Sequence, residues 1–139
     1  MKRLYIDVDG VLLGKDKPGD IKMVLARHAT EFMELALANF DCYWLTTHCD
    51  GEAQQVIRYL RPYASREFLE LIKPVKPTWF KTFKTEALRG NFYWIDDSPT
   101  ATELLWLRDE GFNNRWINVN TSKHPDDLLR AMEVLKTVK

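Results

Sequence analysis

The sequence predicts an α/β fold in three layers, a doubly wound parallel sheet with helices on both faces. Short apolar runs alternate with amphipathic segments along the chain, and polar residues follow three of the apolar runs. Such alternation of strands and helices is typical of parallel sheets, in which helices form the crossovers. The 139 residues show no internal repeat and no linker, so we expect a single domain over residues 1–139.

The first half of the chain is predicted to contain two strands and two helices around a flap. Gly14, Pro18 and Gly19 separate short apolar pieces after the first strand, which favours a loop or small hairpin. Apolar residues then recur at helical spacing in two segments. In chain order, the expected elements are a strand at 4–8, a flap at about 11–26, a helix at 29–39, a strand at 41–45 and a helix at 52–60.

The second half is less regular. Ser65 can cap a short helix at 66–71, and Pro74 limits residues 72–75 to a poor edge strand because proline donates no ladder hydrogen bond. Ser98 as cap and Pro99 as first helical residue predict a helix that runs to about Glu110. The other expected elements are a helix at 80–88, strands at 92–95 and 115–119, and a terminal helix from Pro125 with Leu128, Leu129, Met132 and Leu135 facing inward.

Composition excludes several classes of protein. Lys plus Arg equals Asp plus Glu, 20 against 20, so the charge does not indicate nucleic-acid binding, although a local basic groove is left open. Only three apolar residues lie between Arg3 and Asp7, too few for a signal peptide, and no stretch reaches the ~20 apolar residues of a membrane span. Cys42 and Cys49 form no metal-binding spacing and are expected to be free thiols in a reducing cytoplasm.

Polar residues of chemical interest follow three predicted strands, and a lysine precedes the third. Ligands collect outside the carboxyl ends of parallel strands, so these side chains are expected to meet at one edge. Crowded carboxylates repel one another, and Mg²⁺, which prefers oxygen ligands and is often shared with a phosphate, would offset that repulsion. The residues are Asp7 and Asp9, then Thr46 and Thr47, then Asp96 and Asp97, with Lys84 as the lysine.

The stretch "DVDGVLL" resembles the first motif, DxDGxx, of the haloacid dehalogenase (HAD) superfamily. Later pieces match that superfamily in order: "YWLT" closing the second strand, "KTEAL" before the third, and "FYWIDDS" at its end. The resemblance covers about residues 3–110. It implies a Rossmann-like, HAD-like sheet and a magnesium-dependent phosphatase.

The resemblance also implies a role for each matching residue. Asp7 would be the nucleophile that forms an aspartyl phosphate, and Asp9 the general acid and then base. Thr46 would hydrogen-bond the phosphoryl group, and Lys84 would offset the negative charge. Gly10 would permit a tight turn after the aspartates.

Magnesium would be held by Asp96 and Asp97 together with the Asp7 carboxylate and the backbone carbonyl of Asp9. Adjacent residues on a strand point in opposite directions, so which of Asp96 and Asp97 touches the ion is open. Thr47 is an alternative to Thr46, and Lys81 to Lys84, three residues away on about the same helix face. His48 is expected in a loop, from which it could reach substrate.

The spacing of the motifs leaves room for a flap but for no cap domain. An open site favours a large phosphorylated substrate, such as a protein or a nucleic-acid end. The alternatives are a partner subunit that supplies a lid, which would make the protein an oligomer, or a small phosphoester held under the flap. A phosphotransferase and a non-catalytic phosphate-sensing module are the other functions left open.

Overall fold

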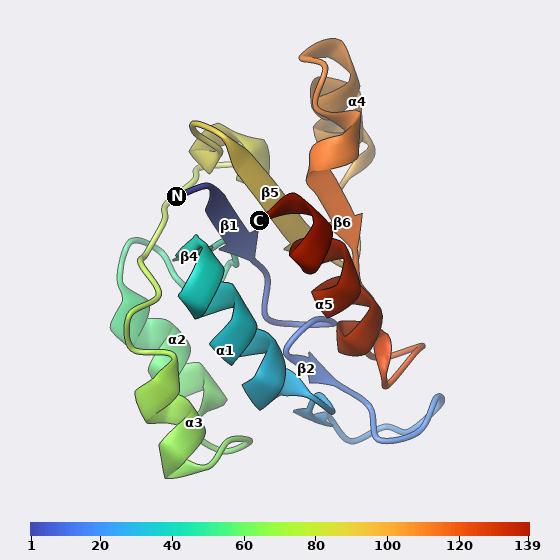
Figure 1. The fold of residues 1–139 in the computed structure, drawn as a ribbon. Helices are drawn as coiled ribbons and strands as arrows, with labels where there is room; N and C mark the ends of the chain where they lie inside the picture. Colours follow the sequence, from blue (N-terminus) through green and yellow to red (C-terminus); the bar gives the residue numbers. More distant parts are fainter.

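The computed structural model describes all 139 residues. Its central sheet consists of four parallel strands in the order β4-β1-β5-β6 (Figure 1). This parallel α/β sheet flanked by helices was predicted and is confirmed; it is consistent with a Rossmann-like fold. The strands are β1 (Arg3–Ile6), β4 (Asp41–Trp44), β5 (Phe92–Asp96) and β6 (Trp116–Asn118).

Five α-helices and two 3₁₀ turns accompany the sheet, and a separate antiparallel hairpin forms the flap. The hairpin strands are β2 (Leu13–Gly14) and β3 (Val24–Leu25). The helices are α1 (Ala29–Asn39), α2 (Ala53–Leu60), α3 (Arg66–Leu71), α4 (Ala101–Asp109) and α5 (Asp127–Val138), and the 3₁₀ turns are η1 (Lys84–Ala87) and η2 (Asn113–Arg115). None of the helices is long and apolar enough to cross a lipid bilayer.

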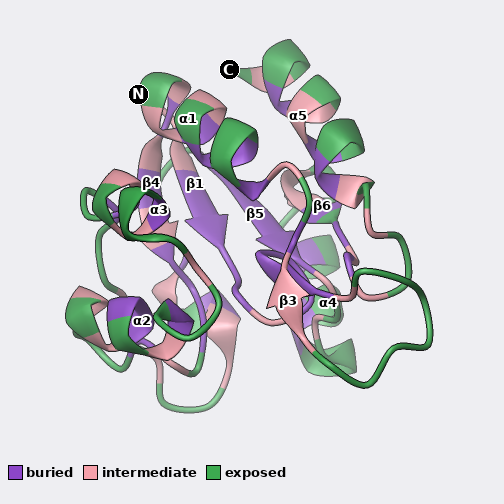
Figure 2. Ribbon diagram, turned by 90° about the horizontal axis from the view of Figure 1, so that it is seen from below, coloured by how far each residue is buried: buried purple, intermediate pink, exposed green.

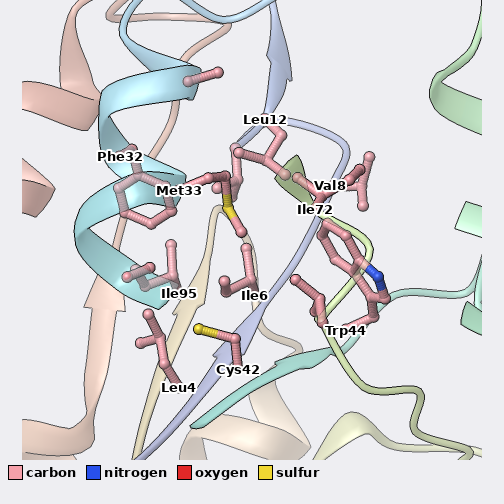
Figure 3. Packing of buried hydrophobic residues seen from close by; sticks show 14 of the residues in the cluster. Leu4, Ile6, Val8, Leu12, Phe32, Met33, Cys42, Trp44, Ile72 and Ile95 are labelled. Carbon is pink, nitrogen blue, oxygen red and sulfur yellow. The ribbon is translucent and has the colours of Figure 1, made fainter. Parts of the chain in front are cut away.

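The sheet is buried on both faces, because alternate side chains of each strand enter different cores (Figure 2). Leu4 and Ile6 join the larger core, which includes residues of α1, α2, α3 and α5. Figure 3 shows Phe32 and Met33 of α1 among the labelled side chains of that core. The smaller core, on the other face, comprises Tyr5, Leu45, Leu88, Phe92, Trp94 and Leu107.

The register places the ends of three strands at one edge of the sheet. Ile6 of β1 pairs with Trp44 of β4 on one side and with Ile95 of β5 on the other. The chain passes from β1 to β4 on one side of β1 and then crosses to β5 on the other side. The direction in which strands are added to the sheet therefore reverses between β1 and β5. Such a switch point is where open α/β sheets bind ligands.

The predicted helix at 80–88 is wrong. Only the 3₁₀ turn η1 is helical there, because the Glu86 carboxylate accepts hydrogen bonds from the backbone N–H groups of Lys81, Thr82 and Phe83. The predicted strand at 72–75 is also wrong: these residues form a turn in which the Val75 N–H donates to the Ile72 carbonyl, and the only pairing with β4 is a single parallel bridge from Lys76 to Tyr43.

Two helix assignments also need correction. Helix α4 begins at Ala101, and its cap is Thr100, not Ser98: the Thr100 hydroxyl accepts from the Glu103 N–H and the Glu103 carboxylate accepts from the Thr100 N–H. In α5, Leu129 is 45% exposed, and Ala131 occupies the inward face between Leu128 and Leu135.

The flap is fixed at its base to the loop that follows β6. The buried Thr121 hydroxyl donates to the backbone carbonyl of Val11 at 3.0 Å. A Cβ atom at Gly14 would lie 2.3 Å from the Thr121 hydroxyl oxygen, so only glycine fits there. The base of the flap is therefore closely packed and hydrogen-bonded to the loop after β6.

Candidate active site

Three carboxylates converge at the switch point of the sheet. Asp7 directly follows β1, Asp96 is the last residue of β5, and Asp97 comes next. One carboxylate oxygen from each of the three lies within 4.8 Å of those from the other two. Asp7 and Asp96 are 5% and 0% exposed. Carboxylates buried this closely repel one another strongly unless positive charge lies among them.

Lys84 supplies part of that positive charge. Its Nζ lies 2.6 Å from an oxygen of Asp96 and 3.2 Å from an oxygen of Asp7, and only 16% of its side chain is exposed. Lys81, the alternative in the sequence, is exposed and lines a neighbouring cavity with Thr46 and Thr47. The structure therefore places Lys84, and not Lys81, against the carboxylates.

Glu103, which was not predicted as a site residue, holds the backbone of Lys84 in place. Its buried carboxylate accepts from the Lys84 N–H at 2.6 Å and from the Thr100 N–H at 2.8 Å. The spacing T-x-x-E at the start of α4 is a capping-box signal that could have drawn attention to this glutamate.

The environment raises the pKa values of Asp7, Asp97 and Lys84, which favours extra protons or cations at the site. Burial, reinforced by Asp96, raises the pKa of Asp7 well above its ordinary value, although Lys84 opposes the shift. Burial and Asp96 likewise raise the pKa of Asp97. Burial alone would lower the pKa of Lys84, but Asp7 and Asp96 outweigh it and the pKa is raised. One ammonium thus leaves an excess of negative charge.

Asp96 and Asp97 differ in how far their oxygens are already occupied. One oxygen of Asp96 accepts from Lys84, and the other accepts from the Ser98 N–H at 3.0 Å. Asp97 is half-buried, and its contact with a side-chain donor is the Ser98 hydroxyl at 3.4 Å. Asp97 therefore has more free capacity for a cation.

Gly10 allows Asp97 to reach its position. The backbone of Gly10 has φ +78°, a left-handed conformation that favours glycine. A Cβ atom at this residue would lie 2.2 Å from Asp97 Oδ2 and 2.5 Å from Asp97 Cγ. The glycine after the two aspartates is thus required by the turn and by the close approach of Asp97.

The Asp9 carboxylate is not part of the three-carboxylate group. One of its oxygens accepts from the Tyr59 hydroxyl at 2.7 Å, and the other accepts from His48 Nε2 at 2.8 Å. The hydrogen bond from the tyrosine to Asp9 contributes, after burial, to a raised pKa of Tyr59. His48 was expected in the loop after Thr46, whereas Tyr59 was not predicted as a site residue, because its position in an amphipathic helix carries no chemical signal.

Thr46 and Thr47 directly precede His48, the hydrogen-bond partner of Asp9. Thr46 is buried, and its hydroxyl oxygen accepts from the His48 N–H at 3.3 Å. Thr47 is exposed and lines the same cavity as Thr46. That cavity has a volume of about 480 Å³ and is lined by Thr46, Thr47, His48, Asp50, Gln55, Phe80 and Lys81. It offers space for part of a ligand beside His48, which is hydrogen-bonded to Asp9.

Both cysteines are buried free thiols. Burial raises the pKa of Cys42 to about 12, so this thiol is protonated at neutral pH.

Comparison of the sequence with protein-family models, and searches among curated proteins and solved structures, found no match. The arrangement of the residues themselves is therefore the evidence for function.

Proposed function

We propose that the protein is a magnesium-dependent phosphatase of HAD type that works through an aspartyl phosphate. One observation carries the proposal: the Lys84 ammonium bridges Asp7 and Asp96, while Asp97 completes a three-carboxylate cluster at the switch point. The bridge between Lys76 and Tyr43 supports a doubly wound, HAD-like sheet, since it extends parallel pairing by one residue beyond β4.

The donor set suits Mg²⁺. The carboxylates of Asp7 and Asp97 and the backbone carbonyl of Asp9 would hold the ion, because Mg²⁺ prefers oxygen ligands and retains several waters. Asp96 would orient Lys84 and balance its charge. When bound, the ion would neutralise charge on the phosphoryl oxygens and orient them for in-line displacement.

In the first step, an Asp7 carboxylate oxygen attacks phosphorus. The bond from phosphorus to the leaving oxygen breaks, and Asp9 donates its proton to that oxygen. Lys84 stabilises the negative charge that spreads over Asp7 and the transferring group, and the Thr46 hydroxyl donates to a phosphoryl oxygen.

In the second step, water attacks the phosphorus of the aspartyl phosphate. Asp9, now a carboxylate, accepts a proton from the water, and the bond between phosphorus and Asp7 breaks. Inorganic phosphate leaves and Asp7 is restored. Transfer to an acceptor alcohol in place of water would make the protein a phosphotransferase by the same steps.

The substrate side of the site is compatible with a large phosphorylated partner. Between Gly10 and α1 lies only the flap hairpin at residues 13–25, and the helices between Thr46 and Lys84 are only the short α2 and α3. A phosphorylated protein or nucleic-acid end could reach such a site without a cap having to open. The cavity beside Thr46 could receive the group attached to the phosphate.

Hydrolysis of 4-nitrophenyl phosphate with and without Mg²⁺ tests the proposal, with Asp7→Asn as the control for the nucleophile. We expect magnesium-dependent turnover that Asp7→Asn abolishes. Turnover that survives in the variant would exclude Asp7 as nucleophile. No turnover by the wild type on a panel of phosphoesters, together with phosphate binding, would favour the phosphate-sensing alternative.

A further inference from the structure

Two aromatic residues form hydrogen bonds with the Asp9 side chain. The Tyr59 hydroxyl donates to Asp9 Oδ1 at 2.7 Å, and His48 Nε2 donates to Asp9 Oδ2 at 2.8 Å. The two rings stack on each other, with centroids 3.6 Å apart and planes inclined by 14°. Tyr59 lies near the end of α2, and His48 lies in the loop after β4. Two separate segments therefore define the position of one carboxylate.

Asp9 is accessible to solvent although both of its carboxylate oxygens are hydrogen-bonded. Its side chain is 49% exposed, while that of His48 is 28% exposed. The His48 N–H also donates to the Thr46 hydroxyl oxygen at 3.3 Å, so one loop holds both the phosphoryl-binding threonine and a partner of Asp9. The cavity lined by Thr46, Thr47 and His48 opens on this side, where a leaving group could lie.

The chemistry of the two partners suits a carboxyl group that gives and takes a proton. A tyrosine hydroxyl can donate or accept a hydrogen bond, and a neutral imidazole has one donor and one acceptor nitrogen. A lysine or arginine could only donate. Tyr59 and His48 can therefore remain bonded to Asp9 when it is a carboxylate and when it is a carboxylic acid.

We infer that His48 and Tyr59 are positioning residues that hold Asp9 toward the oxygen of the leaving group. The inference rests on the proposed function, in which Asp9 protonates that oxygen. Neither residue belongs to the motifs that carry the HAD resemblance, and neither touches the three-carboxylate cluster through a hydrogen bond.

The test compares two substrates of similar shape, phenyl phosphate and 4-nitrophenyl phosphate. Phenolate is the poorer leaving group and depends more on a proton from Asp9. The ratio kcat/KM reports the first phosphoryl transfer, which is the step that needs this proton. Tyr59→Phe removes the hydroxyl and keeps the ring stack, His48→Phe removes the hydrogen bond and keeps an aromatic ring, and His48→Gln retains a donor near the position of Nε2.

Tyr63→Phe is the matched control. Tyr63 lies 6.3 Å from Tyr59 between ring centroids, and no hydrogen bond joins its hydroxyl to Asp9. We expect Tyr59→Phe and His48→Phe to lower kcat/KM on phenyl phosphate about tenfold or more beyond their effect on 4-nitrophenyl phosphate, since a positioned general acid contributes roughly 10²–10⁴-fold. His48→Gln should recover much of the loss, and Tyr63→Phe should show none.

Equal losses of kcat/KM on both substrates, or a rise in KM alone, would overturn the inference. The proposed phosphatase function would still stand in either case. Failure of His48→Gln to recover activity would also overturn the role assigned to the His48 hydrogen bond. If the wild type turned over neither substrate, the proposed function would fail and the inference with it. Urea unfolding of each variant separates these outcomes from loss of the fold.

Discussion

Substitution of Gly10 by alanine tests the geometry of the proposed metal site separately from the stability of the chain. Gly10 and Gly111 have almost the same backbone conformation, with φ +78° and +79°. An alanine Cβ at Gly10 would lie 2.2 Å from Asp97 Oδ2, whereas at Gly111 nothing lies within 4 Å. The pair therefore shares the backbone cost and differs in the clash.

The magnitude follows from these distances. Alanine in the left-handed region costs about 1–2 kcal/mol at either site. Carbon and its neighbours are normally about 3.5–4.0 Å apart, so the Asp97 carboxylate must move by more than about 1 Å in Gly10→Ala. Because Mg²⁺ requires its ligands at about 2.0–2.1 Å, such a shift would remove Asp97 from the proposed coordination shell.

Isothermal titration with Mg²⁺ and urea unfolding measure the two effects. We expect Gly10→Ala to lose at least as much stability as Gly111→Ala, because it adds a clash to the shared backbone cost. Gly10→Ala should also weaken Mg²⁺ binding about tenfold or more, whereas Gly111→Ala should leave it unchanged; supporting residues of metal sites typically contribute about 10–100-fold. Equal Mg²⁺ affinity in the two variants would refute the placement of Asp97 as a ligand.

Three further predictions concern charge and capping. Lys84→Met should cost about 3–5 kcal/mol of unfolding free energy, as removal of one partner of a buried pair does, and Mg²⁺ should restore part of it; a loss below about 1 kcal/mol in urea would contradict the ion-pair geometry. Because the folded-state pKa of Asp7 is raised, metal-free protein should lose stability as the pH rises from the unfolded value of about 3.9 through the folded one. Asp7→Asn in EDTA should remove that loss, so its unfolding free energy should exceed that of the wild type by more at pH 8 than at pH 4, and an equal difference at both would count against the shift. Thr100→Ala should cost about 1 kcal/mol and Ser98→Ala at most about 0.5 kcal/mol, and the reverse order in thermal unfolding would restore Ser98 as the cap of α4.

The sheet was predictable because its signals are local. The apolar runs before Asp7 and Asp96 identify β1 and β5, and the alternation with helices predicts parallel pairing, which brings the ends of the strands to one edge. This is also why the three-carboxylate cluster and Lys84 could be expected together. The helix predicted at 80–88 failed because the Glu86 side chain takes up backbone N–H groups that a helix would need.

The supporting residues were not predictable in the same way. Tyr59 reaches Asp9 across 50 positions of sequence, and Glu103 reaches the Lys84 backbone across 19. Such contacts depend on how α2 and α4 pack against the sheet, and local pattern does not encode that. Glu103 has a local sequence signal, the capping box with Thr100, whereas Tyr59 has none.

The most direct test of the metal centre is anomalous diffraction from a crystal soaked in Mn²⁺, used in place of Mg²⁺. We expect one strong peak within bonding distance of the Asp7 and Asp97 carboxylates, and its loss in Asp97→Asn. Ordered carboxylates with no peak among them, or a peak only elsewhere on the chain, would contradict the claim that these aspartates gather at the sheet edge to bind a divalent cation.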